Sequence, residues 1–215
     1  MVVYEDSLQQ RGKHETKHRW FAAHAVEIQQ TRFDGKHDVP VSFGDYYRDG
    51  SNVVIDTKRN LAEIAQNISR DHRRFRDECA RAQRDGYRLI ILVENNERVR
   101  CLRDLLEWTN RHCELCAEYR RHGCVPADTS TKCARHGTNK PIQGARLAKA
   151  MATMSAKYGV RFEFCEPTES ARRICELLGV IYEQDANSSA EVARARLEND
   201  SNQTRHEDSR DQERR

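Results

Sequence analysis

The sequence of 215 residues contains no apolar run that approaches the length of a membrane span. Its first ten residues also lack the apolar core and the small-residue cleavage pattern of a secretory signal. No internal repeat is present, which excludes a solenoid or another repeat array. These absences predict a soluble, intracellular and cytoplasmic protein that has no membrane partner.

Apolar residues are also scarce, because they make up 37% of the chain while charged residues make up 33%. This ratio predicts an exposed polar segment, and residues 183–215 contain almost nothing to bury. We therefore expect one main domain over residues 1–182 and a disordered polar tail over residues 183–215. The formal net charge is +3, and the tail holds more acidic than basic residues. The predicted domain is thus more cationic than the whole chain, which permits it to bind a polyanion.

The hydrophobic pattern of the first part of the chain predicts two types of element. A strand is expected over residues 2–5 and a helix over residues 14–24. Residues 39–45 alternate between apolar and polar or small side chains, which predicts a strand with one buried face. A turn at residues 49–51 and a β-branched run at residues 53–56 follow, so we expect these two strands to form a hairpin.

The remaining pattern alternates helices with strands. One long amphipathic helix is expected over residues 61–86, and the apolar run at residues 89–93 is typical of a strand covered on both faces. A strand, a helix and a strand in this order predict a right-handed parallel crossover. Further elements are expected as helices at residues 99–106, 147–158 and 174–178 and as a strand at residues 160–164. The sequence therefore predicts an α/β fold.

Two acids and a lysine are expected at the tip of the predicted hairpin. Asp56 and Lys58 lie two residues apart at the end of an apolar strand, so their side chains leave the same face. Asp45 ends the preceding strand, and strand pairing would bring it near Asp56. Two carboxylates and the Thr57 carbonyl can hold Mg²⁺ or Mn²⁺, while Lys58 can orient a water or stabilise a phosphate. The alternative is a solvated strand end, because charged residues commonly end strands.

The surrounding segments extend this pattern. They are Gly44-Asp45-Tyr46, Val54-Ile55-Asp56-Thr57-Lys58, Leu61-Ala62-Glu63-Ile64, Arg74-Phe75, the apolar strand that ends at Glu94, and Lys157-Tyr158-Gly159-Val160. Over most of residues 2–180 the chain resembles the nuclease domain of XPF-type (excision-repair cross-complementation) structure-specific endonucleases. These enzymes belong to the PD-(D/E)xK, restriction-endonuclease-like superfamily. The family's Gly-Asp falls on Gly44 and Asp45, its Glu on Asp56 and its Lys on Lys58.

The resemblance implies a central mixed sheet flanked by helices. It also implies metal-dependent hydrolysis of DNA, with Mg²⁺ or Mn²⁺ held by Asp45 and Asp56 and with Lys58 as the third catalytic residue. The last acid of the family pattern would fall on Ala62, one residue before Glu63. Helicase motifs and a paired helix-hairpin-helix module, which accompany this domain in relatives, are absent from the sequence.

Other charged residues are candidates for supporting roles. Accessory positions in the site are expected for four acids, Glu63, Glu5, Asp6 and Glu94, the last three of which end predicted strands. Arg73 and Arg74 lie in a segment that matches the family and follow the active-site strand, so we expect them to contact DNA phosphates. For the arginines the alternative is a solvated helix face, because acids alternate with them. For the acids the alternative is a solvated edge, because acids commonly end strands.

Half of the eight cysteines gather in residues 110–141, a polar segment called here the Cys-rich insert. They are Cys113, Cys116, Cys124 and Cys133, with His112, His122 and His136 nearby. A segment this polar cannot form its own core, and a structural Zn²⁺ on the four thiolates, with His112, His122 or His136 as an alternative to one of them, would stabilise it. The alternative is a flexible reduced loop. The other cysteines, Cys79, Cys101, Cys165 and Cys175, are expected to be buried packing residues.

Three functions fit these patterns. The leading one is a metal-dependent DNA endonuclease that cuts branched or flap DNA in repair, recombination or phage DNA processing. The others are a DNA-binding scaffold without catalysis and a zinc-stabilised interaction module. Retention of Asp45, Asp56 and Lys58 favours the endonuclease. The sequence leaves a homodimer open and does not distinguish RNA from DNA as the substrate.

Overall fold

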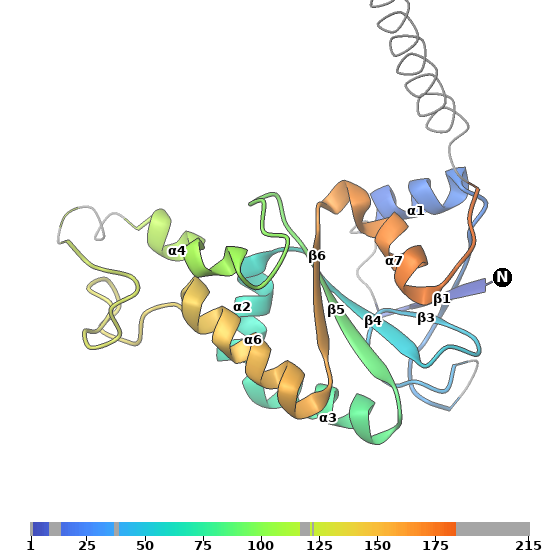
Figure 1. Ribbon diagram of the computed structural model, residues 1–215, viewed down its shortest axis with the longest axis horizontal. Coiled ribbons are helices and arrows are strands. Elements are labelled where there is room, and N and C mark those ends of the chain that lie inside the picture. The colour runs from blue at the N-terminus through green and yellow to red at the C-terminus, as the bar shows by residue number, and fades with distance from the viewer. Residues whose placement is uncertain (1, 9–13, 37–38, 117–120, 122, 184–215) are drawn as a thin grey trace, which may run out of the picture.

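The computed structural model describes residues 2–8, 14–36, 39–116, 121 and 123–183. Its centre is a six-stranded sheet in the order β2, β1, β3, β4, β5, β6 (Figure 1). The strands are β1 (Val2–Asp6), β2 (Glu27–Thr31), β3 (Tyr46–Arg48), β4 (Val53–Lys58), β5 (Arg88–Glu94) and β6 (Arg161–Cys165). Only the pairs that involve β3 are antiparallel, so β3 runs against all the other strands of this mixed sheet.

Helices cover both faces of the sheet (Figure 1). One face carries α1 (Glu15–Ala23) and α7 (Ser170–Leu178), and the other carries α2 (Leu61–Ser69), α3 (His72–Arg84) and α6 (Gly144–Tyr158). The short helices are η1 (Asp104–Glu107), α4 (Arg111–Glu114) and η2 (Pro167–Glu169). No helix in the described ranges is both long enough and apolar enough to cross a membrane.

Each face of the sheet has its own hydrophobic core. The core under α1 and α7 includes Val3, Phe21, Ile55, Leu92 and Ile174. The core under α2, α3 and α6 includes Val54, Ile64, Phe75, Ile91 and Met151. Neighbouring residues of β4 and of β5 belong to opposite cores, because successive side chains of a strand point to opposite faces. Polar side chains at the ends of these strands are therefore also divided between the two faces.

The parallel strands bring polar residues to one edge of the sheet. β1, β4 and β5 run in the same direction, and they end at Asp6, Lys58 and Glu94. The carboxyl ends of parallel strands form the usual ligand crevice of an open α/β sheet. Asp56 and Lys58 follow Val54 on the α3 face, whereas Glu5 follows Val3 on the α1 face.

The predicted strand over residues 39–45 is wrong, because the antiparallel strand begins only at Tyr46. Val39, Val41 and Phe43 do bury their side chains in the core under α2 and α3. The alternation therefore reflects burial without pairing along the sheet. Gly44, which has a φ of 75°, turns the backbone just before β3, so the hairpin consists of β3 and β4.

The single helix predicted over residues 61–86 is also wrong. It is divided into α2 and α3 by Arg70 and Asp71. The hydroxyl of Ser69 donates a hydrogen bond to the Ala65 carbonyl at 2.6 Å, and the Arg70 and Asp71 amides both donate to the carbonyl of Gln66. Short polar side chains compete for backbone groups in this way and favour the end of a helix.

The helix predicted over residues 99–106 is reduced to the short turn η1. The Asn95 side chain organises the preceding loop, because it accepts a hydrogen bond from the Val99 amide and donates one to the Val99 carbonyl. The polar edge strand β2 has no counterpart among the predictions, because its side chains are exposed or half-buried and show no apolar alternation. Cys101 is exposed, which corrects the prediction that it is buried.

The predicted α/β class, a mixed sheet flanked by helices, is confirmed. The structure also contains the predicted strands at residues 2–5, 53–56, 89–93 and 160–164 and the predicted helices at residues 14–24, 147–158 and 174–178. Cys79, Cys165 and Cys175 are buried as predicted. The predicted tail lies, apart from Glu183, outside the described residues, as does the alternative zinc ligand His122.

Candidate active site

Asp45 is positioned by a close approach of its backbone to β4. Its amide donates to the Ile55 carbonyl at 2.7 Å, and its carbonyl accepts from the Asp6 amide at 2.9 Å. At Gly44 a Cβ atom would stand only 2.5 Å from Cγ1 of Val54. Because Gly44 also has a φ of 75°, a residue with a side chain is excluded there without displacement of β4. The Gly-Asp pair is thus a geometric requirement for bringing Asp45 to the strand.

Asp45, Asp56 and Lys58 are brought together and are all buried. Lys58 Nζ donates to Asp56 Oδ1 at 2.7 Å and lies 2.5 Å from Oδ2. The Asp45 carboxylate accepts from the Thr57 amide at 2.7 Å and from the Thr57 hydroxyl at 2.5 Å through the same oxygen, Oδ2. Lys58 Nζ also stands 5.7 Å from the ring centre of Phe75 on α3. The site is therefore enclosed between β4 and α3.

Glu78 on α3 is a third carboxylate of this cluster, and sequence reasoning did not assign it a role. Its Oε1 accepts a hydrogen bond from the Gly44 amide at 3.3 Å. Its charge interacts with those of Asp56, Lys58 and Arg74. Glu78 lies three residues after the buried Phe75 on the helix, and this spacing is the signal by which it could have been found.

The carboxylates affect each other's ionisation. Burial and the charge of Asp56 raise the pKa of Asp45 to about 7, against the opposing effects of Lys58 and Thr57. Burial and Asp56 also raise the pKa of Glu78. Burial alone would lower the pKa of Lys58, but the carboxylates of Asp56 and Asp45 outweigh it and raise that pKa. The cluster therefore has more negative charge than its one ammonium can compensate.

A divalent cation fits this donor set. Asp56 Oδ2 is buried, and within the described part of the chain its partner is the Lys58 ammonium at 2.5 Å. Mg²⁺ and Mn²⁺ bind carboxylate oxygens, and such an ion would compensate the excess of negative charge at Asp45, Asp56 and Glu78. In the described ranges, no three His, Cys, Asp or Glu side chains are arranged so that they could hold a metal ion together. Binding of an ion at this cluster therefore requires its side chains to rearrange.

Two of the acids with predicted accessory roles are engaged with nearby backbone. Glu63 accepts from the Arg59 amide at 3.1 Å, and its own amide donates to the Asn60 side chain at 2.8 Å, so these contacts cap the start of α2. Asp6 accepts hydrogen bonds from the amides of Leu8 and Phe33. Within the described contacts, both carboxylates thus bind backbone amides.

Glu5 belongs to a different polar network on the α1 face of the sheet. It is fully buried, and Tyr46 donates to its Oε1 at 2.6 Å. His14 approaches the same oxygen at 2.9 Å, while His18 and Gln30 each lie 2.8 Å from Oε2. Burial opposes ionisation, but these hydrogen bonds outweigh it and lower the pKa of Glu5 to about 2. This network joins β1, β2, β3 and α1.

Glu94 also faces α1 and α7. Its Oε1 lies 2.6 Å from Lys17 Nζ and accepts from the Ser170 hydroxyl at 2.8 Å. All three residues are buried, so the pair is shielded from water. The ion pair therefore connects the end of β5 to α1, and the hydrogen bond from Ser170 connects it to α7. Both contacts lie on the face opposite to Asp56.

Arg73 and Arg74 lie near the start of α3 and are exposed. The side chain of Arg73 is 91% exposed and, within the described part of the chain, lies 4.0 Å from the Asp77 carboxylate. The charge of Arg74 opposes the raised pKa of Glu78, whose carboxylate lies with those of Asp45 and Asp56. Arg74 is thus the arginine of this pair with an electrostatic connection to the candidate active site.

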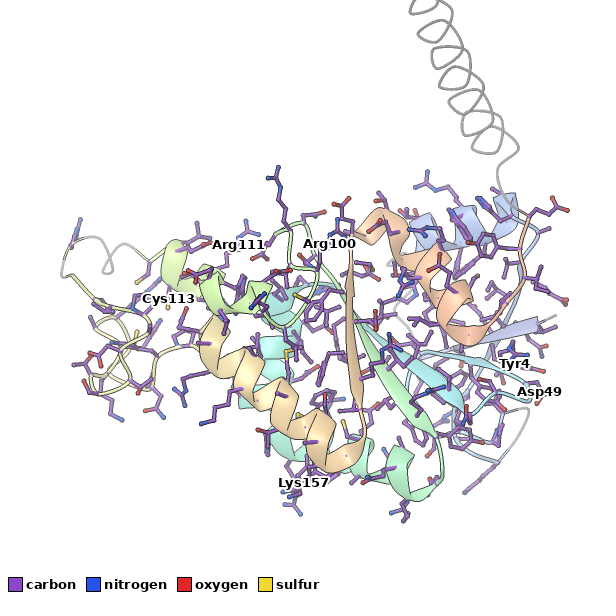
Figure 2. All side chains as sticks on the ribbon, in the orientation of Figure 1. Tyr4, Asp49, Arg100, Arg111, Cys113 and Lys157 are labelled. Carbon is purple, nitrogen blue, oxygen red and sulfur yellow. The ribbon has the colours of Figure 1, made fainter. Side chains whose placement is uncertain are left out.

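The four cysteines of the Cys-rich insert gather at the end of the molecule opposite to Tyr4 and Asp49, as the position of Cys113 shows (Figure 2). Cys113 is buried, and Cys116, Cys124 and Cys133 are partly buried. Burial and the charges of Cys124, Cys133 and Cys116 raise the pKa of Cys113. The four thiols are therefore within electrostatic reach of one another.

The structure has an α/β architecture in which a mixed sheet lies between two helical layers, with a carboxylate and lysine cluster at the end of a central strand. No protein-family model matches the sequence, and a search of the curated proteins finds no match. Solved structures of XPF from Aeropyrum pernix are similar to this chain.

One of these structures has 18% sequence identity and a TM-score of 0.48, and the match covers 92% of this chain and 69% of that chain. The second, XPF from Aeropyrum pernix in complex with DNA, has 18% identity and a TM-score of 0.46. It covers 82% of this chain, which spans 62% of that one. The likeness concerns the arrangement of strands and helices and assigns no role to a residue of this chain.

Proposed function

We propose that this protein is a metal-dependent endonuclease that hydrolyses phosphodiester bonds in DNA. The observation that supports this function best is the convergence of Asp45, Asp56 and Lys58 at the end of β4, in a cluster with excess negative charge. Burial and the neighbouring carboxylate raise the pKa of Asp45 to about 7, and perturbed pKa values cluster at functional sites. In metal-assisted phosphodiester hydrolysis, carboxylates of this kind hold the cation.

Asp45 and Asp56 would hold Mg²⁺ or Mn²⁺, with Glu78 as a further carboxylate within the same cluster. The bound ion would polarise a phosphate oxygen and promote the ionisation of a water. Thr57 donates to one oxygen of Asp45 through both its amide and its hydroxyl, and so orients this carboxylate. Gly44 donates to Glu78 and so holds that carboxylate against the turn that carries Asp45.

Lys58 is the cation of the resting cluster and would stabilise charge on the phosphate. Its ammonium is buried and bound to Asp56, and its raised pKa keeps it protonated over the whole physiological range. A buried, permanently charged donor near the scissile phosphate stabilises the additional negative charge that develops there. Lys58 could equally orient the attacking water by donating a hydrogen bond to it.

Arg73 and Arg74 would contact the DNA backbone. They are exposed and lie on α3, the helix that also carries Glu78. Phosphate contacts from such arginines position a duplex without reading its sequence. Accessory roles for Glu5, Asp6, Glu63 and Glu94 in the same reaction remain part of the proposal, although their observed contacts are with other groups.

The biological setting that we propose is the cutting of branched or flap DNA in repair, recombination or phage DNA processing. The nuclease unit would comprise residues 1–182 with the Cys-rich insert within it, followed by a polar tail over residues 183–215. Cytoplasmic localisation and assembly as a homodimer complete the proposal. A DNA-binding scaffold without catalysis is the alternative, and it predicts binding without cleavage.

The deciding experiment incubates the purified protein with labelled flap, fork and junction DNA in the presence of Mg²⁺, Mn²⁺ or EDTA. We expect metal-dependent cleavage that is lost in Asp56→Asn, because the amide retains the shape but not the charge that holds the ion. Asp49→Asn is the matched control, since Asp49 is exposed in a turn and its role as an acceptor for Gly50 survives the change. Cleavage by Asp56→Asn at the wild-type rate would refute the proposed site.

A further inference from the structure

The Cys-rich insert consists largely of turns over its described residues. The helix α4 at its start has four residues. Two of its apolar side chains, Leu115 and Val125, are 70% and 57% exposed, so neither contributes to a core. Lys140 links parts of the loop through hydrogen bonds to the carbonyls of Val125 and Asp128 and to the Thr131 hydroxyl. Apolar burial therefore does not account for a defined conformation of this segment.

Two tight turns present pairs of ligand residues. In the first, the Cys116 amide donates to the Cys113 carbonyl at 3.1 Å, at the end of α4. In the second, the Cys133 carbonyl accepts from the amides of His136 and Gly137, and the Cys133 amide donates to the Thr138 carbonyl at 2.8 Å. Each turn therefore places two sulfur or nitrogen ligands three residues apart on the same short stretch of backbone, which is the spacing of structural zinc sites.

These two turns face one pocket. It has a volume of about 700 Å³ and lies between the insert and α2. Its walls include all four thiols of the insert, Cys113, Cys116, Cys124 and Cys133, together with His112 and His136. In the described ranges, no three of these side chains stand as a preformed ligand group. Binding of a metal therefore requires these side chains to rotate, while the backbone of the two turns stays in place.

We propose that the insert binds one structural Zn²⁺ through the thiolates of Cys113, Cys116, Cys124 and Cys133. Each thiol loses its proton to solvent when its sulfur binds the ion, and no bond is oxidised or reduced. Thiolates select zinc over the hard cations that suit the carboxylate cluster, so the two metals occupy separate sites. His136 follows Cys133 in the second turn and is the residue that would replace Cys124 if the fourth ligand were a nitrogen.

The zinc site would be connected rigidly to the nuclease unit. The Asn110 amide donates to the side-chain oxygen of Gln143 at 2.9 Å, and both residues are buried. The same Gln143 side chain donates to the sulfur of Cys113 at 3.3 Å and to the Pro141 carbonyl. A metal bound at Cys113 would thus be linked through one side chain to the start of α6. This inference is independent of the proposed nuclease activity.

The test measures zinc in the purified, reduced full-length protein by atomic emission and compares single variants. We expect about one Zn²⁺ per chain. Cys113→Ser and Cys124→Ser should each reduce this content several-fold, whereas Cys101→Ser, which changes an exposed cysteine outside the insert, should leave it unchanged. His136→Ala should also leave it unchanged. Replacement of the zinc by Co²⁺ should give the intense visible absorption that four thiolates produce.

Several outcomes would overturn the proposal. Absence of zinc after purification without chelators, in protein that also fails to take up added Zn²⁺, would do so. Equal zinc content in Cys101→Ser and both insert variants would do so as well. Loss of zinc in His136→Ala together with retention in Cys124→Ser would replace the four-thiolate set by three thiolates and an imidazole. Asp56→Asn should retain its zinc, and this distinguishes failure of the zinc site from failure of the proposed nuclease.

Discussion

The buried carboxylate of Glu5 should stabilise the folded protein in a way that depends on pH. Tyr46 and three further side chains, from α1, β2 and the residue before α1, surround this carboxylate on all sides. In Glu5→Gln the negative charge disappears. The amide N–H₂ group would also stand where a carboxylate oxygen accepts hydrogen bonds in the wild type. The variant tests whether this network contributes mainly to folding, although Glu5 was predicted from the sequence as an accessory residue of the active site.

The magnitude follows from the pKa. Burial opposes ionisation, but the hydrogen bonds lower the pKa of Glu5 from 4.5 to about 2. At about 1.4 kcal/mol per pH unit, the difference corresponds to about 3 kcal/mol of stability. Because the folded pKa is depressed, this stability is fully present above pH 5 and is lost as the pH falls from 4.5 towards 2. We expect the contribution to decrease to about 1.5 kcal/mol at pH 3.

The assay is urea denaturation of the wild type, of Glu5→Gln and of the control Glu27→Gln at pH 7, 5, 4 and 3. Glu27 is an exposed acid of the neighbouring strand β2, so its replacement should change the free energy of unfolding by less than about 0.5 kcal/mol. The difference between wild type and Glu5→Gln should be about 3 kcal/mol at pH 7 and about half of that at pH 3. A difference that is constant with pH would refute the role of the ionised carboxylate.

Three further predictions concern the candidate active site. Lys58→Ala should reduce single-turnover cleavage by at least about 100-fold with little change in DNA affinity, which is checked by rapid quench and by fluorescence anisotropy. Arg73→Ala with Arg74→Ala should do the reverse and should flatten the salt dependence of binding, because fewer counterions are released. Equal binding defects in the lysine and arginine variants would contradict both assignments. Gly44→Ala should destabilise the fold by about 3 kcal/mol in thermal or urea denaturation, because its Cβ would overlap Val54 and its φ is positive. A decrease in the free energy of unfolding of less than about 1 kcal/mol would show that β4 can shift to accommodate the added methyl group.

The sequence was most informative where side-chain pattern and backbone geometry coincide. β5 was predicted because an uninterrupted apolar run is required by a strand with helices on both faces. Asp56 and Lys58 were predicted to share a face because the two-residue period of a strand has no alternative. Asp45 was correctly expected near Asp56. It does not end a strand over residues 39–45, however, but directly precedes β3.

The features that could not be predicted depend on contacts between distant segments. Glu78 belongs to the cluster because α3 packs against the turn at Gly44. Gly44 lies 34 residues before Glu78 in the chain. Glu5 and Glu94 end strands at the same edge as Asp56, but their positions in the alternation turn them to the opposite face. β2 was missed because an edge strand with exposed side chains gains its stability from backbone pairing with β1, which leaves no pattern in the side chains.

The contact between Asn110 and Gln143 also has a consequence for how the chain can change over evolutionary time. These residues stand at the two ends of the Cys-rich insert, and a single hydrogen bond of 2.9 Å joins them. A segment whose ends lie close together does not stretch the sheet, so its length can change while the sheet is preserved. A shortened variant in which a brief turn joins Asn110 to Gln143 should fold as the wild type does. The insert is therefore the place where homologues of this chain are expected to differ most in length.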